Sequence, residues 1–337
     1  MIDPHQVAEK LSAFLHREHN AKSLSIDGLR LLTGGASRQT WSFDATIDGQ
    51  TYALVARADP RKQPGLMARD VEYRVLEAAE AAGVPVPKVH AMGDDSFGAP
   101  FFLMERVEGE TIARRILRDE EYASAREGMA ARLGEILASI HRLAPDEALR
   151  ESLSAPVPGM SAAESELSRF ETTFRSIAPE THPAFELTFR WLKGHVPPAA
   201  ETTLVHGDYR MGNLIVGADG VRAVLDWELA HIGDPMEDLA WMCVRSWRFG
   251  NDDKPVGGVG RREDFFAAYE AASGRPIDRE TVHWWEVFGN VRWGVICIMQ
   301  ARAYLDGFSK SVELAAIGRR TAETEWEMLS LIGHEHA

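Results

Sequence analysis

Cysteine is scarce in this sequence, and several features that define other protein classes are missing. Only two cysteines occur in 337 residues, Cys243 and Cys297, far apart and each within an apolar helical pattern. This count excludes a disulfide framework and a CxxC metal site, so we expect two buried thiols. Gly/Ser, Gln and Pro tracts are also absent, as are internal repeats, which excludes long linkers and disordered tails.

The sequence also has little basic character and no long apolar run. The formal net charge is −14 and no Lys/Arg cluster forms the basic stripe that a phosphate backbone requires, so we expect no nucleic-acid partner. Residues 291–299 are far shorter than the roughly 20 apolar residues of a membrane span, and residues 1–5 lack signal-peptide character. We therefore expect a cytoplasmic protein with no membrane partner. Its acidic surface serves either solubility or the attraction of a cationic substrate.

The first hundred residues have the pattern of strands arranged around one crossing helix. A helix is predicted over residues 66–82 because Gly83 and the Val84-Pro85 break end it. Asp48-Gly49 is a hairpin turn signal between two alternating segments. Strands are predicted at residues 29–33, 41–47, 51–57, 88–92 and 100–107. The pattern predicts a five-stranded antiparallel sheet in a nucleotide-binding lobe over residues 1–107.

From residue 108 onward the helical period dominates. A long amphipathic helix is predicted through Leu133, Ile136 and Ile140, and the chain after residue 235 is predicted to be helical throughout. Strand signals occur only at residues 203–205, 213–216 and 221–225, and the last two flank a turn at 218–220. We predict a larger, mainly helical lobe over residues 108–337 that carries one catalytic β-hairpin, and hence a two-lobed α+β fold.

Three polar residues around this hairpin have the spacing that phosphoryl transfer requires. A kinase needs a carboxylate to orient the acceptor hydroxyl and accept its proton, and oxygen ligands for magnesium. Asp208 and Asn213 lie five residues apart on one loop, and Asp226 ends the second hairpin strand, where an antiparallel return brings it back beside Asn213. We predict Asp208 as the catalytic carboxylate and Asn213 and Asp226 as Mg²⁺ ligands.

The segment 206–213 resembles the aminoglycoside-phosphotransferase-like kinase family, which is related in fold to protein kinases. The family's hallmark is His-Gly-Asp, four residues, Asn, then a short hairpin and Asp-Trp or Asp-Phe; this chain has His-Gly-Asp at 206–208 and Asp-Trp at 226–227. Residues 226–230 and 233–240 are similar to the branch related to the kinase domains fused to some acyl-CoA dehydrogenases. The resemblance covers nearly the whole chain. It implies a protein-kinase-like fold, ATP and Mg²⁺ as cofactors, and a small-molecule hydroxyl acceptor.

The resemblance also implies where the nucleotide binds. It places Gly34, Gly35 and Ser37 over the phosphates, where small side chains let backbone N–H groups approach closely. Together with strand order, it places the main-chain groups of Glu105 and Val107 against the adenine edge.

The chain departs from the family at the lysine that pairs with the phosphates. Only Arg57 lies near the expected place, and Glu72 on the following helix is well placed to orient it. Arginine can bind phosphate in a bidentate way, so we predict that Arg57 replaces the lysine; the alternative is an exposed arginine at a strand end. Arg210 lies where protein kinases carry a lysine and is predicted to stabilise the transferring phosphoryl group, with a surface salt bridge as the alternative.

Other polar and aromatic residues receive structural interpretations. His206 is interpreted as holding the loop by backbone hydrogen bonds, Asp234 as a helix cap, and Glu228 as an exposed acid. The tryptophans of the helical lobe are interpreted as core rather than as the wall of an acceptor pocket; they are Trp241, Trp247, Trp284, Trp285 and Trp293.

These observations predict an ATP- and Mg²⁺-dependent phosphotransferase that acts on a small-molecule hydroxyl. A protein kinase is disfavoured because little room for an activation segment follows Asp226. A nucleotide-binding pseudokinase with a regulatory role is the alternative, raised by Arg57. The family name and the acidic pairs 252–253 and 263–264 suggest an aminoglycoside acceptor, whereas the dehydrogenase-related branch points to a hydroxylated acyl or other metabolic compound. The sequence indicates no oligomeric state.

Overall fold

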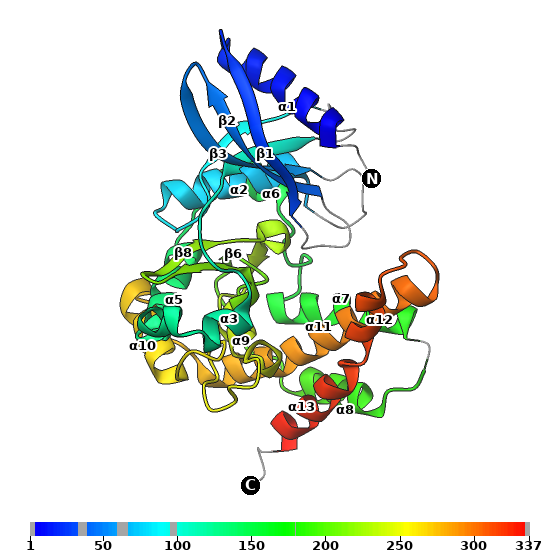
Figure 1. Ribbon diagram of the computed structural model, residues 1–337. Coiled ribbons are helices and arrows are strands. Elements are labelled where there is room, and N and C mark those ends of the chain that lie inside the picture. The colour runs from blue at the N-terminus through cyan, green and yellow to red at the C-terminus, as the bar shows by residue number, and fades with distance from the viewer. Residues whose placement is uncertain (1–3, 33–38, 59–66, 95–99, 179, 334–337) are drawn as a thin grey trace. The chain divides into compact units, whose positions relative to one another are not determined.

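Two units make up the chain (Figure 1), and the structure, a computed structural model, describes residues 4–32, 39–58, 67–94, 100–178 and 180–333. Unit 1 contains residues 1–109, 145–153 and 222–229. Unit 2 contains residues 110–144, 154–221 and 230–337.

Unit 1 is built on the five-stranded antiparallel sheet that the sequence predicts. Its strands are β1 (Leu24–Leu32), β2 (Gln39–Ile47), β3 (Gln50–Ala58), β4 (Val89–Met92) and β5 (Phe101–Glu105). They pair in the order β1-β2-β3-β5-β4, with every neighbouring pair antiparallel. Asp48 and Gly49 both have positive φ, at 48° and 88°, which is the geometry of the tight hairpin turn expected between β2 and β3.

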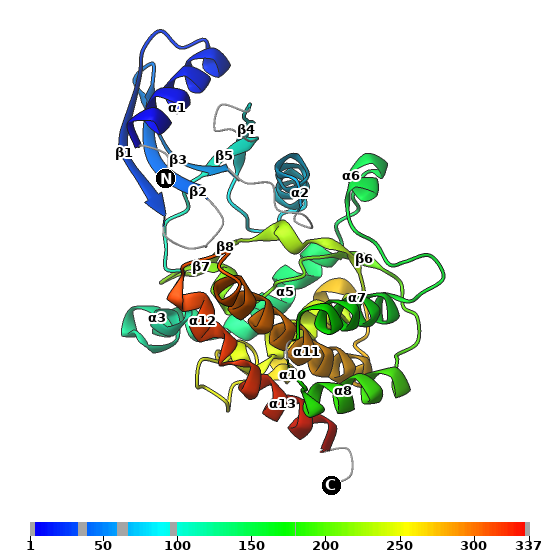
Figure 2. The same ribbon diagram turned by 90° about the vertical axis from the view of Figure 1, so that its right-hand side faces the viewer.

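Helix α1 (Pro4–His19) covers one side of this sheet because its apolar residues share one face. Val7, Leu11 and Phe14 are buried in a cluster that includes Trp41 of β2 and Phe101 of β5. The helix lies along the sheet in Figures 1 and 2. Unit 1 also contains α2 (Arg69–Ala81), α6 (Glu147–Ser152) and the short 3₁₀ helix η4 (Trp227–Leu229); η marks 3₁₀ helices throughout.

Unit 2 is mainly helical, as predicted. Gly134 lets two of its helices approach closely, since a Cβ at this position would lie only 2.3 Å from the Phe265 carbonyl oxygen. These helices, α5 (Met129–His141) and α10 (Arg262–Ser273), lie side by side in Figures 1 and 2. The remaining helices are α3 (Ala113–Arg118), η2 (Glu120–Tyr122), α4 (Ala123–Arg126), α7 (Ala162–Ile177), α8 (Pro183–Gly194), η3 (Met211–Asn213), α9 (Met236–Cys243), η5 (Arg245–Trp247), α11 (Arg279–Leu305), α12 (Val312–Gly318) and α13 (Thr321–Gly333).

Two short two-stranded sheets flank the loop between residues 206 and 213. β7 (Leu214–Gly217) and β8 (Gly220–Val224) form the predicted hairpin, and the boundary between the units falls within β8, after Val221. The pairing of β6 (Thr203–Val205) with β9 (His231–Gly233) was not predicted, because a three-residue strand is too short to show a sequence period. No helix among the described residues combines the length and the apolar character needed to cross a membrane.

Candidate active site

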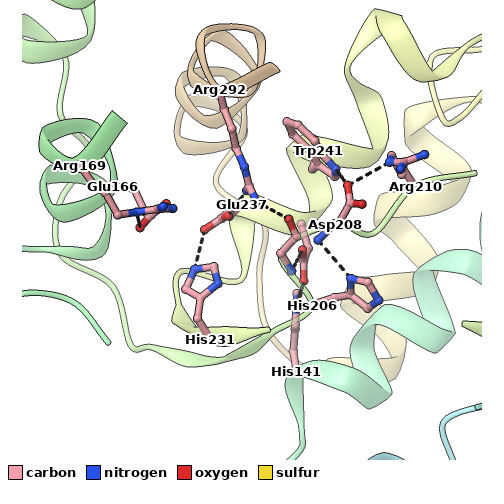
Figure 3. Close-up of polar contacts among 12 residues, drawn as sticks. His141, Glu166, Arg169, His206, Asp208, Arg210, His231, Glu237, Trp241 and Arg292 are labelled. Atoms are coloured by element: carbon pink, nitrogen blue, oxygen red, sulfur yellow. Dashed lines mark hydrogen bonds and ion pairs between the residues drawn. The ribbon is translucent and has the colours of Figure 1, made fainter. Parts of the chain in front are cut away.

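The carboxylate of Asp208 lies at the centre of a set of hydrogen-bond donors in unit 2 (Figure 3). Oδ1 accepts from Arg210 Nε at 2.9 Å and from Trp241 Nε1 at 2.8 Å. Oδ2 accepts from the side-chain nitrogen of Asn213 at 2.6 Å. Three of the residues predicted for the site, Asp208, Arg210 and Asn213, are therefore in direct contact. Three donors on two oxygens fix the orientation of the carboxylate.

The loop that carries Asp208 is held by backbone hydrogen bonds to buried side chains. Gly207 has a φ of +76°, a conformation that favours glycine. Asp238 accepts from the amides of His206 at 2.7 Å and Gly207 at 2.9 Å. The amide of Asp208 donates to His206 Nδ1 at 3.1 Å, which agrees with the structural interpretation of His206.

Asp238 is a residue of the candidate site that the sequence analysis did not single out. It is fully buried, and His141 contacts its Oδ2 through Nε2 at 3.1 Å, while the other ring nitrogen of His141 contacts the Tyr269 hydroxyl at 2.8 Å. Burial acts to raise the pKa of Asp238, but hydrogen bonds and electrostatic interactions with His141 and His206 together outweigh it, and the pKa is lowered. An acid inside the apolar segment 236–243 was the signal that could have identified it.

Helix α9 presents its side chains to this loop because of its spacing. Asp238 and Trp241 are three residues apart and Glu237 and Trp241 are four apart, so all three lie toward one side of the helix. Asp234 was predicted as the helix cap, but the N-cap residue of α9 is Pro235. Asp234 lies one residue earlier and its side chain accepts from the amide of Met236 at 2.9 Å. Burial raises the pKa of Asp234.

Arg210 does not form a surface salt bridge, the alternative considered from the sequence. It pairs with Asp208 itself, and its guanidinium lies 4.7 Å from the ring centre of Trp247. Trp247 packs with Trp241 and Trp293 in one cluster. The core interpretation of the tryptophans therefore holds for most of their surface, but the indole N–H of Trp241 reaches the candidate catalytic carboxylate, which aromatic patterning does not reveal.

Arg57 of unit 1 is buried, so the alternative of an exposed strand-end arginine is wrong. Its side chain is 9% exposed and makes ion pairs with Glu72 at 3.2 Å, Asp226 at 2.9 Å and Glu228 at 3.6 Å. Glu72 also pairs with Arg69 on the same helix. Arg57 therefore pairs with Glu72 of α2, the contact that the sequence analysis expected.

Glu228 is not the exposed acid that the sequence suggested. Its side chain is 19% exposed because it joins the cluster around Arg57. Asp226 has a φ of +60°, which is uncommon for a residue with a side chain. Its Oδ1 accepts a hydrogen bond from Arg57, so this backbone conformation accompanies a side chain directed at the arginine.

The remaining residues predicted to bind nucleotide differ in how far the structure describes them. The amide of Glu105 donates to the Lys88 carbonyl at 2.7 Å, and the amide of Arg106 to the Ala53 carbonyl at 2.9 Å. The amide of Val107 makes no backbone hydrogen bond to the described part of the chain. Gly34, Gly35 and Ser37 lie outside the described residues.

The candidate Mg²⁺ ligands have suitable chemistry. Asp226 offers a carboxylate that is 41% exposed. Asn213 uses its amide nitrogen on Asp208, which leaves its amide oxygen for a cation. Hard oxygen donors of this kind are what Mg²⁺ prefers.

A second group with metal-binding side chains occurs in unit 2. Ligand atoms of Glu166, His231 and Glu237 lie within 4.8 Å of one another (Figure 3). Arginine already neutralises both carboxylates, since Arg169 pairs with Glu166 and Arg292 with Glu237. A cation would meet two guanidinium groups there, so we interpret the group as a charge network.

Unit 2 also has a cavity of about 850 Å³, large enough for a small molecule. Arg245 and Asp252, which pair at 2.7 Å, lie in its wall with the aromatic side chains of Phe249 and Trp326. One residue of the acidic pair 252–253 is thus already neutralised. Asp264 of the other acidic pair is paired with Arg261 at 2.8 Å.

Comparison with known proteins gives one consistent picture. The model of the phosphotransferase enzyme family matches residues 28–276. Acyl-CoA dehydrogenase family member 10 of Mus musculus is 30% identical over 299 residues, covering 83% of this chain and 27% of that protein. Acyl-CoA dehydrogenase family member 11 of Homo sapiens is 31% identical over 199 residues, 57% of this chain and 25% of that protein. The chain spans about a quarter of the length of these relatives.

Solved structures show the same fold over nearly the whole chain. A Ralstonia eutropha JMP134 protein with the provisional name aminoglycoside phosphotransferase has a TM-score of 0.74 and 27% identity, covering 96% of this chain and 98% of that chain. Spectinomycin phosphotransferase in complex with ADP and spectinomycin has a TM-score of 0.64 and 11% identity, covering 97% and 98% of the two chains. The predicted kinase-like fold is confirmed.

Proposed function

The chain belongs to the phosphotransferase enzyme family, and from this premise we propose that it transfers the γ-phosphoryl group of ATP to a hydroxyl of a small molecule, with Mg²⁺. In this proposal the acceptor oxygen forms a bond to the γ-phosphorus as the bond to the bridging oxygen of ADP breaks. The hydroxyl proton passes to Asp208. We propose that the protein acts in the cytoplasm, because ATP, the phosphoryl donor, is available there.

The observation that carries the proposal is the position of the Asp208 carboxylate. Arg210, Trp241 and Asn213 orient it through three hydrogen bonds, and it is partly exposed, with 17% of its side-chain surface accessible. A carboxylate fixed in this way can receive a proton without first reorganising its surroundings. Arg210 adds a cation beside it that can stabilise charge on the transferring group.

Nucleotide binding is proposed for unit 1. ADP, GDP and AMP-PNP are bound in the similar structures named as aminoglycoside or spectinomycin phosphotransferases. We propose that Arg57, oriented by Glu72, pairs with the phosphates in place of a lysine, and that Asn213 and Asp226 supply Mg²⁺ ligands. Bound Mg²⁺ would neutralise charge on the phosphates. The other proposed nucleotide contacts are Gly34, Gly35, Ser37, Glu105 and Val107.

For the acceptor, we propose a hydroxylated acyl or other metabolic compound ahead of an aminoglycoside. Relatives named acyl-CoA dehydrogenase family members support the first class, and similar structures named aminoglycoside phosphotransferases support the second. The acidic side chains that suggested a cationic acceptor include Asp252 and Asp264, and arginines pair with both.

A regulatory nucleotide-binding protein is a second candidate because of Arg57. Its guanidinium is surrounded by three carboxylates, which would have to release it for phosphate binding. Such a protein would bind ATP but phosphorylate no acceptor.

The test is acceptor-dependent ADP release by the purified protein with ATP, Mg²⁺ and a panel of hydroxylated acyl compounds and aminoglycosides. We expect Asp208→Asn to lower turnover by about 10³-fold, the usual scale for a general base. Glu313→Gln removes an exposed carboxylate of α12 in the same unit and serves as the control, with expected wild-type turnover. Turnover that survives in Asp208→Asn would refute the mechanism, and ATP binding without turnover on any acceptor would favour the regulatory role.

A further inference from the structure

Buried side chains in unit 2 fix the backbone of the catalytic loop one peptide after another. Asp238 accepts from the amides of His206 and Gly207, which fixes two peptide units. The next peptide, between Gly207 and Asp208, is held at both of its polar atoms. Its N–H donates to His206 Nδ1 at 3.1 Å, and its C=O accepts from Arg292 Nη2 at 2.6 Å.

This last peptide needs restraint because of the residue that precedes Asp208. Gly207 has a φ of +76° and no side chain, so its backbone has more alternative conformations than any other residue would have. A flip of the Gly207–Asp208 peptide would turn its C=O and N–H to the opposite sides of the chain. Any part of this rotation that the φ of Asp208 does not compensate would also redirect the Cα–Cβ bond of Asp208, because that bond leaves the atom directly after the peptide.

Arg292 is itself held firmly enough to provide the restraint. It lies on α11 and is 3% exposed, and its Nη1 donates to Glu237 Oε1 at 2.7 Å. The guanidinium lies 4.7 Å from the ring centre of Trp241 and 5.7 Å from that of Phe170. In Figure 3 it points from its helix toward Glu237 and the catalytic loop.

Glu237 makes this arrangement electrically neutral. It is 3% exposed, and its second oxygen lies 3.2 Å from His231 Nε2. A buried guanidinium is tolerated when a carboxylate pairs with it. Because one nitrogen of Arg292 is used on Glu237 and another on Gly207, the planar group cannot rotate without losing a charged hydrogen bond.

We propose that Arg292 is a positioning residue that locks the Gly207–Asp208 peptide and thereby directs the Asp208 carboxylate toward the acceptor hydroxyl. Glu237 acts through Arg292 by fixing its guanidinium. The restraint of the Gly207–Asp208 peptide is a claim about the loop alone. Its effect on turnover rests on the proposed function. The competing explanation is that Arg292 and Glu237 form a buried ion pair that only stabilises the helices.

The chain offers a matched control for this competing explanation. Arg248 is also a largely buried arginine of unit 2, with 11% of its side chain exposed. It also joins a carbonyl to a carboxylate, donating from Nη2 to the Cys243 carbonyl at 2.7 Å and to Glu286 Oε1 at 3.3 Å. It makes no hydrogen bond or ion pair with residues 206–208 of the described chain. Arg248→Met therefore removes the same kind of interaction away from the loop.

The experiment compares Arg292→Met, Arg292→Lys and Arg248→Met by amide hydrogen exchange in the folded proteins. In Arg292→Met we expect the amides of residues 206–208 to exchange at least about tenfold faster, because the freed peptide samples the flipped state. Arg292→Lys keeps a donor for the Gly207 carbonyl and should restore part of the protection. Arg248→Met should leave these amides at the wild-type rate, even with an equal fall in melting temperature.

Kinetics give a second measurement of the same effect. A misdirected catalytic group can cost about 10²-fold in rate, so Arg292→Met should lower kcat by about that factor with the KM for ATP within about twofold of wild type. Equal exchange rates at residues 206–208 in Arg292→Met and Arg248→Met would overturn the proposal. So would a fall in kcat that is proportional to the fall in melting temperature in both variants. If the wild type shows no turnover, the proposed function fails, and hydrogen exchange still decides whether Arg292 locks the peptide.

Discussion

The charged cluster around Arg57 in unit 1 and the loop that carries Asp208 in unit 2 are held together in different ways. Around Arg57 the contacts are between side chains: two arginines, Arg57 and Arg69, face Glu72, Asp226 and Glu228. In the loop before Asp208, the buried side chains bind backbone atoms instead. A guanidinium can exchange a carboxylate for a phosphate and remain paired, whereas loss of a backbone contact changes the shape of the chain. The first arrangement suits ligand exchange and the second suits fixed geometry.

The largest expected effect in this comparison comes from removing Arg57. Arg57→Ala removes the cation shared by Glu72, Asp226 and Glu228. Because Arg69 still pairs with Glu72 and Asp226 is 41% exposed, we expect a loss of about 1–3 kcal/mol in the free energy of unfolding, the cost of removing one partner of a buried polar contact. If Arg57 replaces the phosphate-binding lysine, the Kd for ATP should also rise by roughly 10²-fold, about 2.7 kcal/mol. Denaturant unfolding and calorimetric titration with ATP measure the two effects.

Two further variants help to interpret Arg57→Ala: one keeps the charge at position 57, and the other removes a different arginine as a control. Arg57→Lys keeps the charge and should recover most of the ATP affinity if the charge is what the phosphates need. Arg74→Ala removes an arginine of α2 whose partner Asp146 is 73% exposed, and it should change stability by less than about 1 kcal/mol. ATP affinity that stays at the wild-type level in Arg57→Ala would show that the cluster is purely structural.

A smaller effect is expected from the indole N–H that reaches Asp208. Trp241→Phe keeps an aromatic ring beneath Arg292 but removes the donor to Asp208 Oδ1, so we expect kcat to fall by about tenfold, the value of one hydrogen bond to a charged group. Steady-state kinetics at saturating ATP measure it. Trp285→Phe is the control because its N–H donates to Asp234 at 3.0 Å and not to Asp208. An equal loss of kcat in both variants would mean that packing, and not the N–H, is responsible.

At neutral pH the smallest effect concerns the thiols, both of which belong to unit 2, because they titrate only at alkaline pH. Burial raises the pKa of Cys243 and of Cys297 to about 12, from an ordinary value of 9.0. Between pH 9 and 12 the folded protein therefore keeps protons that the unfolded chain releases, so the free energy of unfolding should decrease as the pH rises through this range.

Thiol labelling tests this expectation and separates the two units. At pH 8 both thiols of the native protein should react with a disulfide reagent far more slowly than in denaturant, because they are buried and protonated. Unit 1 has no cysteine, so labelling detects the opening of unit 2 alone. Rapid labelling of either thiol in the native protein at pH 8 would show that this thiol is not buried and protonated.

Much of the fold could be predicted from local pattern. Alternating residues and the Asp48-Gly49 turn located the hairpin of β2 and β3, and Gly83 with the Val84-Pro85 break located the end of α2. Such signals are local because strand and helix periods repeat every two or 3.6 residues. β9 was not predicted because three residues carry too little pattern, although it pairs with the strand that leads into the catalytic loop.

The candidate site likewise has one part that local sequence spacing revealed and one part that it did not. The spacing of Asp208 and Asn213 was visible in the sequence, and the two side chains are in contact. The partners of the loop were not visible. Asp238 is 30 residues beyond Asp208 and Arg292 is 84 beyond, on helices whose own patterns indicate only burial.

By itself the sequence determined the order of the elements and the local spacing of the residues proposed for chemistry, because turns, periods and short loops depend on neighbours in the chain. Only the tertiary structure decided that Arg57 is buried among carboxylates, that Trp241 donates to Asp208, and that Arg292 holds the peptide before it. These contacts join residues far apart in sequence. Whether such a charge or donor is satisfied depends on which groups packing brings within hydrogen-bond distance, and no local pattern encodes that.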